Sequence, residues 1–513
     1  MSRGVEFIVT LLPFAALMAG FIVFKLDALL NSLLAWLLEL GLVLVFYDMP
    51  LLKCIEASLW GSLTMWAAFL VLYTGQIFGQ AYRATGLLQV LLDSVQSILP
   101  PDDRRGRAAA LTGVIGGFVG TFNGFATYPV TVPGLTALGF GGVDAVVAYL
   151  VYFSWQEALV SLFIAANISN AATRVPIADI AHVIGWFTIP LIFICLLGFF
   201  KVLRFRFFER RTQALFWILG LSNTAAVVIF TQIWPSLYIL TLIASAAFSL
   251  IALYAQGWVV KRGLAAAAAG APVGAASARP HSALRVMKAY MPLMFGALFV
   301  FLTMAPGIAP ALAYFQFDVS AWGNRPVSIN IVTSAGFVVL LTGLLCYCFR
   351  VEDVHILNDL VVASRRSAGC LATLFVGSGM VRLMVDSGQI AFLGKALAGG
   401  GPLVYATLDP VLALLGGIAF GQGLPADYLF AQMQVSVAPA LGLPLVLLVG
   451  IVTVATMGPP NGLKPAIIKY TASLADVTGQ DAVIFRRSLP WQLLQVAAMA
   501  LLSAVVVLLW QPG

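Results

Sequence analysis

Long apolar stretches separated by short polar connections dominate the chain. The stretches that are long enough to cross a bilayer as a helix of about 20 residues include 7–24, 28–46, 182–200, 213–230, 235–254, 327–349 and 491–510. Together with less regular apolar stretches, they predict about 11 to 14 transmembrane segments. We therefore expect an all-α polytopic membrane protein.

The composition and the charge pattern agree with a membrane protein. Of the 513 residues, 61% are hydrophobic and 10% are charged, and the mean hydropathy is +0.99. The net charge of +7 comes from short basic clusters between apolar stretches, such as 201–211 and 261–288. Such clusters mark the cytoplasmic side of a membrane protein. They do not form the continuous basic stripe of a nucleic-acid-binding protein.

The five cysteines give no sign of a disulfide framework or a metal site. They lie mostly in apolar stretches and lack metal-ligand spacing, as expected of small buried hydrophobic residues: Cys54, Cys195, Cys346, Cys348 and Cys370. We predict no metal and no cofactor.

The chain contains an internal repeat. Residues 108–139 align without a gap with residues 411–442, and the alignment matches three glycine pairs, Gly113 with Gly416, Gly120 with Gly423 and Gly139 with Gly442. Upstream, Thr85-Gly86 corresponds to Ser387-Gly388. Repeated halves of this kind are common in secondary transporters.

The repeat and a low-complexity segment divide the chain. The Ala/Gly-rich segment reads as a solvent-exposed linker. We predict N-terminal transmembrane helices at 1–57, a first transport repeat with connecting helices at 58–256, a cytoplasmic linker at 257–288, connecting helices at 289–356 and a second transport repeat at 357–513.

Each half contains a polar, glycine-rich interruption inside an apolar region. The first runs from Thr121 to Pro133, and the second runs from Gly421 to Tyr428. Proline cannot donate to a helical ladder, and non-helical backbone at membrane depth survives only where protein buries it or an aqueous cavity lies beside it. These segments predict re-entrant hairpins or broken helices that meet at a substrate site.

The interruptions supply the candidate substrate-binding residues. Hydroxyl, amide and charged groups lie in both of them and in a further broken segment after Met457-Gly458: Thr121, Asn123, Thr127, Tyr128, Gln422, Asp427, Tyr428, Asn461 and Lys464. Lys464 would neutralise an anionic substrate; alternatively, its side chain reaches the membrane interface. Some of the hydroxyls and amides are expected only to cap broken helix ends.

Proton coupling needs a carboxylate in a dry environment. Asp427 and Glu157, the latter in the polar triplet Trp155-Gln156-Glu157, are the candidates. Secondary candidates are Asn167, Asn170 and Arg174, which form either a half-helix end at the site or an ordinary surface loop, and Arg382 and Asp386, which form either a site or a structural ion pair on one helix face.

Several segments together resemble the lactate permease family. They are LYTGQIFGQAYRATG at 72–86, the glycine-rich interruption before LTALGF, and MGPPNGLKPAIIKYTASLADVTGQDAVIFRRSL at 457–489. The resemblance runs from about residue 7 to residue 510 and implies a bacterial inner-membrane transporter that moves lactate or glycolate with the proton gradient. Two segments depart from the family pattern, residues 421–427 and the Pro459-Pro460-Asn461-Gly462 run, so the carried acid stays open.

We therefore predict a secondary active transporter that carries a small monocarboxylate together with protons across the lipid bilayer. The alternatives are a sodium-coupled carrier of another organic anion and an anion channel. No Gly-x-Ser-x-Gly, His-Glu-x-x-His or phosphate-loop motif is present in the sequence, so we do not expect an enzyme. A homodimer is compatible with this architecture.

Overall fold

The computed structural model describes residues 3–96, 103–122, 124–267, 282–304, 307–322, 326–421 and 423–509. Two predicted site residues, Asn123 and Gln422, lie outside the described residues. Residues 268–281 of the predicted linker at 257–288 lie outside them as well.

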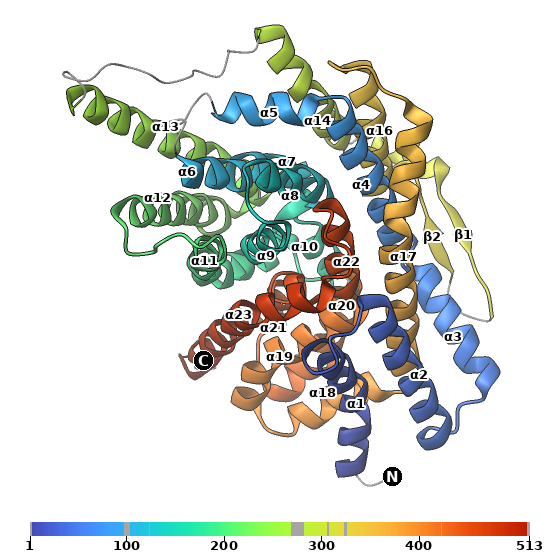
Figure 1. Ribbon diagram of the computed structural model, residues 1–513. Helices are drawn as coiled ribbons and strands as arrows, with labels where there is room; N and C mark the ends of the chain where they lie inside the picture. The colour runs from blue at the N-terminus through green and yellow to red at the C-terminus, as the bar shows by residue number, and fades with distance from the viewer. Residues whose placement is uncertain are drawn as a thin grey trace.

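Helices form almost all of the regular structure (Figure 1). Those of the first half are α1 (Arg3–Ile22), α2 (Ala28–Phe46), α3 (Leu51–Thr64), α4 (Trp66–Ala84), α5 (Leu87–Gln96), α6 (Arg104–Ala109), α7 (Gly116–Phe122), α8 (Tyr128–Ala137), α9 (Gly142–Phe153), α10 (Val160–Thr173), α11 (Ile177–Val202), α12 (Arg210–Val227) and α13 (Thr241–Ala267). Those of the second half are α14 (Ala283–Met304), α15 (Ala309–Leu312), α16 (Ala335–Cys348), α17 (Ile356–Asp386), α18 (Gln389–Ala398), α19 (Pro402–Phe420), α20 (Gly423–Leu441), α21 (Leu445–Met457), α22 (Pro465–Leu474) and α23 (Asp481–Leu509).

The described chain also contains one small hairpin that the hydrophobic pattern does not predict. Strands β1 (Phe317–Val319) and β2 (Val327–Ile329) pair in antiparallel fashion, with Asp318 opposite Ser328. The apolar stretch at 327–349 was expected to be helical throughout, but its first residues form β2 and α16 begins only at Ala335. Hydrophobicity alone does not separate a strand from the start of a helix over so few residues.

Eight helices among the described residues are long and apolar enough to cross a membrane. The number is nine if α3 and α4, which meet at Met65 with a bend of 52°, count as one span. The predicted 11 to 14 segments are not confirmed, because several apolar regions form shorter helices such as α9, α16 and α21. The protein is nevertheless an all-α, multi-pass membrane protein.

The helices end at the predicted interruptions. In the first half, α7 ends at Phe122, a 3-10 turn covers Gly124–Thr127, and α8 follows. In the second half, α19 ends at Phe420 and Gly421 adopts a left-handed φ of +66°, which favours glycine. Both interruptions are shorter than expected: Pro133 lies inside α8, and α20 begins at Gly423, so that Asp427 and Tyr428 are helical.

Two further interruptions complete the set. Between α21 and α22, a 3-10 turn covers Asn461–Leu463. Pro465 is the first residue of α22, where a backbone N–H would have no partner within the helix, so that its absence costs no helical hydrogen bond. Between α9 and α10, residues 154–159 form turns. This last interruption holds Glu157 and contains neither proline nor glycine.

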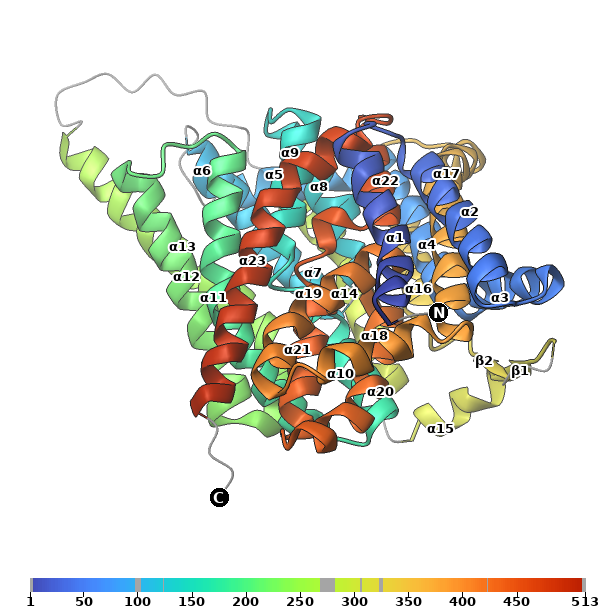
Figure 2. The same ribbon diagram turned by 90° about the horizontal axis from the view of Figure 1, so that it is seen from below.

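The connections of the helices lie at two opposite edges of the molecule (Figure 2). The α1–α2, α11–α12 and α22–α23 connections share one edge, whereas β1, β2 and the end of α23 lie toward the other. The α11–α12 connection carries the basic cluster at 201–211. Its edge is therefore the one expected to face the cytoplasm.

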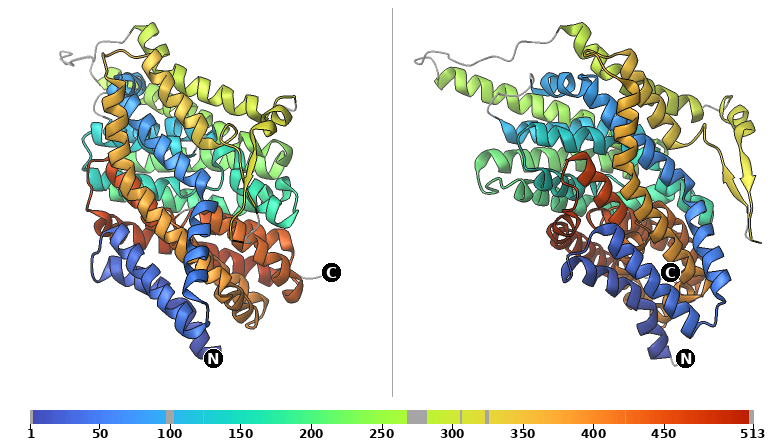
Figure 3. Two further views of the ribbon diagram at one scale, coloured as in Figure 1. Left: turned by 90° about the vertical axis from the view of Figure 1, so that its right-hand side faces the viewer. Right: turned by 45° about the vertical axis from the view of Figure 1, so that its right-hand side comes forward.

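The long helix α17 and the short helix α22 hold the two ends of the chain together. The 31 residues of α17 run along α2, α3 and α4 (Figure 3). Helix α22 lies near the middle of the molecule and packs against α17, α8, α2, α4 and α9 (Figure 1). Segments from both halves of the sequence thus surround α22.

Buried aromatic rings fill the space between α8, α9 and α22. The Tyr128 ring lies 5.5 Å from Tyr149, 5.1 Å from Phe153 and 5.8 Å from Tyr470, measured between ring centroids. All three contacts are edge-on, the arrangement in which a ring edge meets the electron-rich face of its neighbour. This cluster fixes Tyr128 at the start of α8.

Candidate functional site

A cavity of about 710 Å³ brings the interruptions together. Its wall takes Gly124, Phe125 and Tyr128 from the first interruption, Phe420, Leu424 and Tyr428 from the second, and Glu157 and Met457 from the other two. Polar groups at the ends of broken helices therefore face a mostly apolar space. A site with apolar walls and few polar groups is the usual form of a small-ligand site.

A buried ion pair joins Glu157, at the wall of this cavity, to Lys464 in the layer behind it. Lys464 Nζ lies 2.6 Å from Glu157 Oε1, and the two side chains are 0% and 9% exposed. The ammonium also donates to the backbone carbonyl of Met457 at 2.7 Å. Removing either partner would leave an uncompensated buried charge. The alternative that Lys464 reaches the membrane interface is wrong in this structure.

The start of α20 is shaped to leave room for the Lys464 ammonium. A Cβ atom at Gly423 would lie 3.1 Å from Lys464 Nζ and 3.0 Å from the Thr456 carbonyl oxygen. It would also lie only 2.7 Å from the Met457 sulfur. Because α20 begins at Gly423, its positive N-terminal end and the lysine are close to each other. Both favour an anion.

A hydrogen bond joins the first interruption to the one between α21 and α22. The Tyr128 hydroxyl donates to Asn461 Oδ1 at 3.0 Å, and Asn461 Nδ2 donates to the Leu150 carbonyl at 3.3 Å. Both side chains are buried. Tyr128 lines the cavity, whereas Asn461 stands behind it. Two of the predicted binding residues, 333 positions apart, are thus in direct contact.

Asp427 is fully buried and turns toward α10 rather than into the cavity. Ser169 Oγ donates to Asp427 Oδ2 at 3.0 Å, and the Ser169 and Thr453 hydroxyls lie 2.7 Å apart. The neighbouring residues Leu424 and Tyr428 do line the cavity. Asp427 therefore belongs to the layer behind the wall.

The remaining predicted hydroxyls of the first interruption pair with nearby backbone. Thr121 Oγ1 donates to the Gly117 carbonyl at 2.9 Å, and Thr127 Oγ1 donates to the Gly124 carbonyl at 2.6 Å. Each bond runs to the carbonyl three or four residues earlier in the same helix or turn, which is the local back-bonding common for threonine.

The polar run lies in the last turns of α10, and its amides donate to nearby backbone carbonyls. Asn170 Nδ2 donates to the Val175 carbonyl at 2.7 Å, and Asn167 Nδ2 donates to the Phe163 carbonyl at 3.0 Å. Arg174 follows α10 with a left-handed φ of +65° and an exposed side chain. Arg174 thus lies at an exposed helix end, whereas Asn167 and Asn170 belong to the helix itself, and none of the three lines the cavity.

Arg382 and Asp386 form the predicted ion pair on one face of α17, with 2.9 Å between Arg382 Nε and Asp386 Oδ1. Arg382 also lines the cavity. Asp386 does not line it. The ion pair is therefore formed, and a role of Arg382 at the site stays a prediction.

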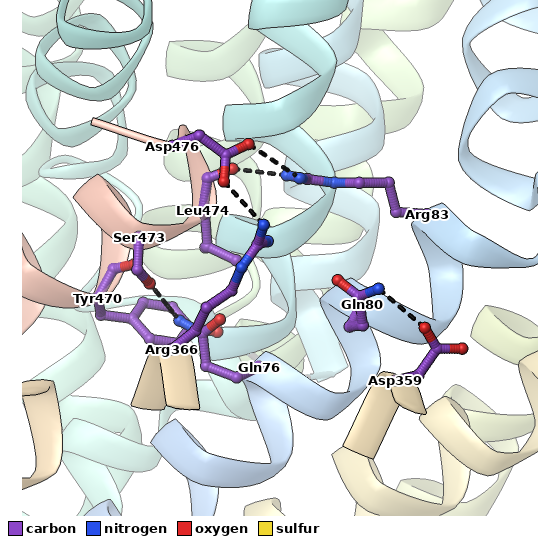
Figure 4. A network of polar contacts seen from close by, with 9 residues as sticks. All are labelled: Gln76, Gln80, Arg83, Asp359, Arg366, Tyr470, Ser473, Leu474 and Asp476. Carbon is purple, nitrogen blue, oxygen red and sulfur yellow. Dashed lines mark hydrogen bonds and ion pairs between the residues drawn. The ribbon is translucent and has the colours of Figure 1, made fainter. Parts of the chain in front are cut away.

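A second charged cluster lies at the opposite end of α22 (Figure 4). Asp476, just after the helix, accepts from Arg83 of α4 at 3.3 Å and from Arg366 of α17 at 2.8 Å. Arg83 also donates to the Leu474 carbonyl at 2.5 Å. Asp476 is 61% exposed. The sequence gives no signal for this cluster, because its members are remote from one another along the chain.

Two glutamine side chains continue this cluster along α4. Gln76 Nε2 donates to Ser473 Oγ at 2.7 Å, and Gln80 Nε2 donates to Asp359 Oδ1 at 2.9 Å (Figure 4). Helix α4 is thus tied both to α22 and to α17.

Within the described ranges, no group of three or more His, Cys, Asp or Glu side chains is placed to hold a metal ion. The five cysteines are free, and four of them are buried.

The family comparison covers the whole of this arrangement. The family model described as L-lactate permease matches residues 6–510. The match extends from α1 to α23 and includes the cavity, the interruptions and the buried ion pair. The comparison with curated proteins gives no match.

Proposed function

Because the chain belongs to the L-lactate permease family, we propose that it carries lactate or a similar 2-hydroxy monocarboxylate with protons across the bacterial inner membrane. Family membership implies a transporter of lactate rather than an enzyme. The observation that carries the more specific proposal is the buried Lys464–Glu157 pair, in which Glu157 lines the cavity.

The proposal follows from the charge of this pair. Lys464 and Glu157 together are neutral. A carboxylate that entered alone would leave one uncompensated negative charge, and a proton that entered alone would leave one uncompensated positive charge. Either state is expensive in a buried site at membrane depth. An anion and a proton that enter together restore neutrality, so their binding is coupled.

In this mechanism, the substrate carboxylate replaces Glu157 as the partner of Lys464. Glu157 takes up a proton and no longer needs the lysine. The N-terminal end of α20, beside Lys464, adds a second favourable interaction for the anion. The Tyr128 hydroxyl is a hydrogen-bonding group for the 2-hydroxyl of the acid, and Phe125 and Phe153 supply apolar wall for its carbon chain.

We also propose that the two halves, within 58–256 and 357–513, are structural repeats. Gly86 and Gly388 both have left-handed φ, +73° and +84°, and each precedes a helix of 10 residues, α5 and α18. In both halves the chain then passes through an interrupted span. A left-handed glycine ends that region in each half, Gly139 at +83° and Gly442 at +66°.

The repeat gives the ion pair a place in the transport cycle. After these glycines, α9 leads to the interruption with Glu157, and α21 leads to the interruption with Lys464. Each half thus contributes one member of the pair. A rocking motion of one repeat against the other would change the distance between the two side chains and the side from which the anion reaches them.

The proposal is tested by uptake into proteoliposomes that contain the purified protein. We expect labelled L-lactate to accumulate when the interior is alkaline, at equal sodium on both sides, and preloaded lactate to accelerate the uptake by counterflow. Uptake that follows an imposed sodium gradient at equal pH would contradict proton coupling. Uptake without counterflow would favour a channel.

A further inference from the structure

Asp427 is a second buried carboxylate, and it differs from Glu157 in having no cation beside it. It is 0% exposed. Ser169 Oγ donates to its Oδ2 atom at 3.0 Å, and among the described residues no group donates to its Oδ1 atom. An ionised carboxylate in this position would be an uncompensated charge in a dry environment.

The elements packed against α20 supply no free cation. They are α21, α10, α19 and α18. Helices α10 and α21 contain no charged residue. On α19, Asp409 accepts from Gln434 at 3.0 Å, and Lys395 of α18 is exposed. The Lys464 ammonium near the start of α20 is already paired with Glu157.

The hydroxyls around Asp427 can be paired in two ways. When Asp427 is ionised, the Thr453 hydroxyl donates to Ser169, and the Ser169 hydroxyl donates to Asp427. When Asp427 is protonated, it donates to Ser169, Ser169 donates to Thr453, and Thr453 donates to the Val449 carbonyl, which lies 2.8 Å away. Every hydroxyl hydrogen has an acceptor in both states. Rotation of the Ser169 and Thr453 hydroxyl groups converts one hydrogen-bond arrangement into the other.

The same distances favour a proton over a metal ion as the ligand. Ser169 Oγ lies 3.0 Å from Asp427 Oδ2 and 2.7 Å from Thr453 Oγ1. These are hydrogen-bond distances. Hard cations are held by a shell of several oxygens that point their lone pairs at one centre, whereas neighbouring oxygens here share hydrogens.

The helices that hold Asp427 also reach the Lys464–Glu157 pair. Ser169 lies on α10, which begins three residues after Glu157. Thr453 lies on α21, which ends at Met457, the carbonyl partner of Lys464. Asp427 lies on α20, which begins beside the lysine. A change at one site therefore displaces helix ends at the other.

We propose that Asp427, with Ser169 and Thr453, is a second proton-binding site, so that the protein carries two protons with each monocarboxylate. This inference rests on the proposed function. With two protons and one anion, each transport cycle moves one net positive charge inward. An electrical potential alone would then drive uptake, whereas a carrier of one proton per anion would not respond to it.

The test measures lactate accumulation in proteoliposomes at equal pH on both sides, with a potassium diffusion potential that is negative inside. The wild-type protein is expected to accumulate lactate about tenfold for each 59 mV, the value for one net charge. Asp427→Asn is expected to lose this response and to retain uptake driven by a pH gradient. The matched control is Asp409→Asn, which alters another fully buried carboxylate without a hydroxyl relay; it should retain both responses.

A second variant covers the case in which Asp427→Asn does not fold. Ser169→Ala keeps the Asp427 carboxyl group but removes the hydroxyl that donates to it when it is ionised and accepts from it when it is protonated. The lactate accumulation driven by the potential should fall by about tenfold. A wild-type protein that responds to pH but not to potential would overturn the second site alone. Uptake that requires sodium, with the requirement removed by Asp427→Asn, would also overturn it. No uptake under any gradient would contradict the proposed function and this inference together.

Discussion

The two ends of α22 carry charged clusters of opposite character. At its start, one lysine and one carboxylate are buried together; the carboxylate lines the cavity, and Lys464 is 0% exposed. At its end, Asp476 is 61% exposed and shared between two arginines. The same helix thus presents charge to a dry site at one end and to solvent at the other.

This difference in solvation determines what each cluster can do. Solvent screens the Asp476 cluster, so each contact is worth about 1 kcal/mol or less. Such a cluster can hold α4, α17 and α22 in position but is easily replaced. In the buried pair, loss of one partner costs about 3 to 5 kcal/mol because the other charge stays uncompensated. A ligand that brings a new partner for one of the two charges can therefore separate the pair.

The largest effect is expected from Lys464→Met, which removes the cation and leaves Glu157 buried without it. We expect pH-driven lactate uptake to fall by at least about 100-fold, corresponding to the lower end of the cost of breaking a buried pair. Lactate should also no longer raise the thermal unfolding temperature of the purified protein.

The matched control for this variant is Lys53→Met. Lys53 forms another Lys–Glu pair, with Glu56 at 2.9 Å, but its side chain is 59% exposed. Uptake should be unchanged in this control. Wild-type uptake by Lys464→Met would show that the substrate does not need this cation.

Glu157→Gln should separate lactate binding from proton coupling. The amide imitates the protonated carboxyl group and leaves Lys464 available for the anion. We expect lactate counterflow to be retained, because exchange needs no net proton movement. The step that binds a proton at position 157 should be absent, and the affinity for lactate should depend less on pH. A variant with the same pH dependence as the wild type would place that proton elsewhere.

Tyr128→Phe should have a moderate effect on the same site. It removes the hydroxyl of a cavity-lining residue, which donates to Asn461 behind the wall. A single hydrogen bond contributes about 0.5 to 1.5 kcal/mol, so we expect lactate affinity to fall by up to about tenfold. Affinity for propionate, which lacks the 2-hydroxyl, should change less. Equal losses for the two acids would mean that Tyr128 does not recognise the hydroxyl group.

The smallest effect is expected from Asp476→Asn. This change weakens the exposed cluster but leaves the cavity intact, so the loss of stability should be at most about 1 kcal/mol. The difference in unfolding temperature from the wild type should shrink at high salt, because salt screens exposed charges. A loss of lactate affinity in this variant would mean that the two ends of α22 are not independent.

The sequence predicts the interruptions better than the contacts between them. Prolines and glycines interrupt the apolar pattern near Gly124, Gly421 and Gly458, and helices end at these places. Arg382 and Asp386 are four residues apart on one helix, so their ion pair also follows from spacing. These are local features, and local backbone chemistry is visible in the residues themselves.

The ion pair could not be predicted in the same way. Glu157 and Lys464 are 307 residues apart, and nothing in either segment specifies the other. The interruption at 154–159 lacks proline and glycine, so only the polar triplet around Glu157 indicates it. Lysine at a helix end has two physical outcomes, burial with a partner or exposure to the interface, and tertiary packing decides between them.

The central claim is that the substrate anion takes the place of Glu157 on Lys464 and that Glu157 is then protonated. Its most direct test is the number of protons taken up when lactate binds to the purified protein, measured by titration calorimetry in buffers of different ionisation enthalpy. The wild-type protein should take up about one proton more per lactate than Glu157→Gln at the same pH. Equal proton uptake by the two proteins, with lactate bound to both, would contradict the claim.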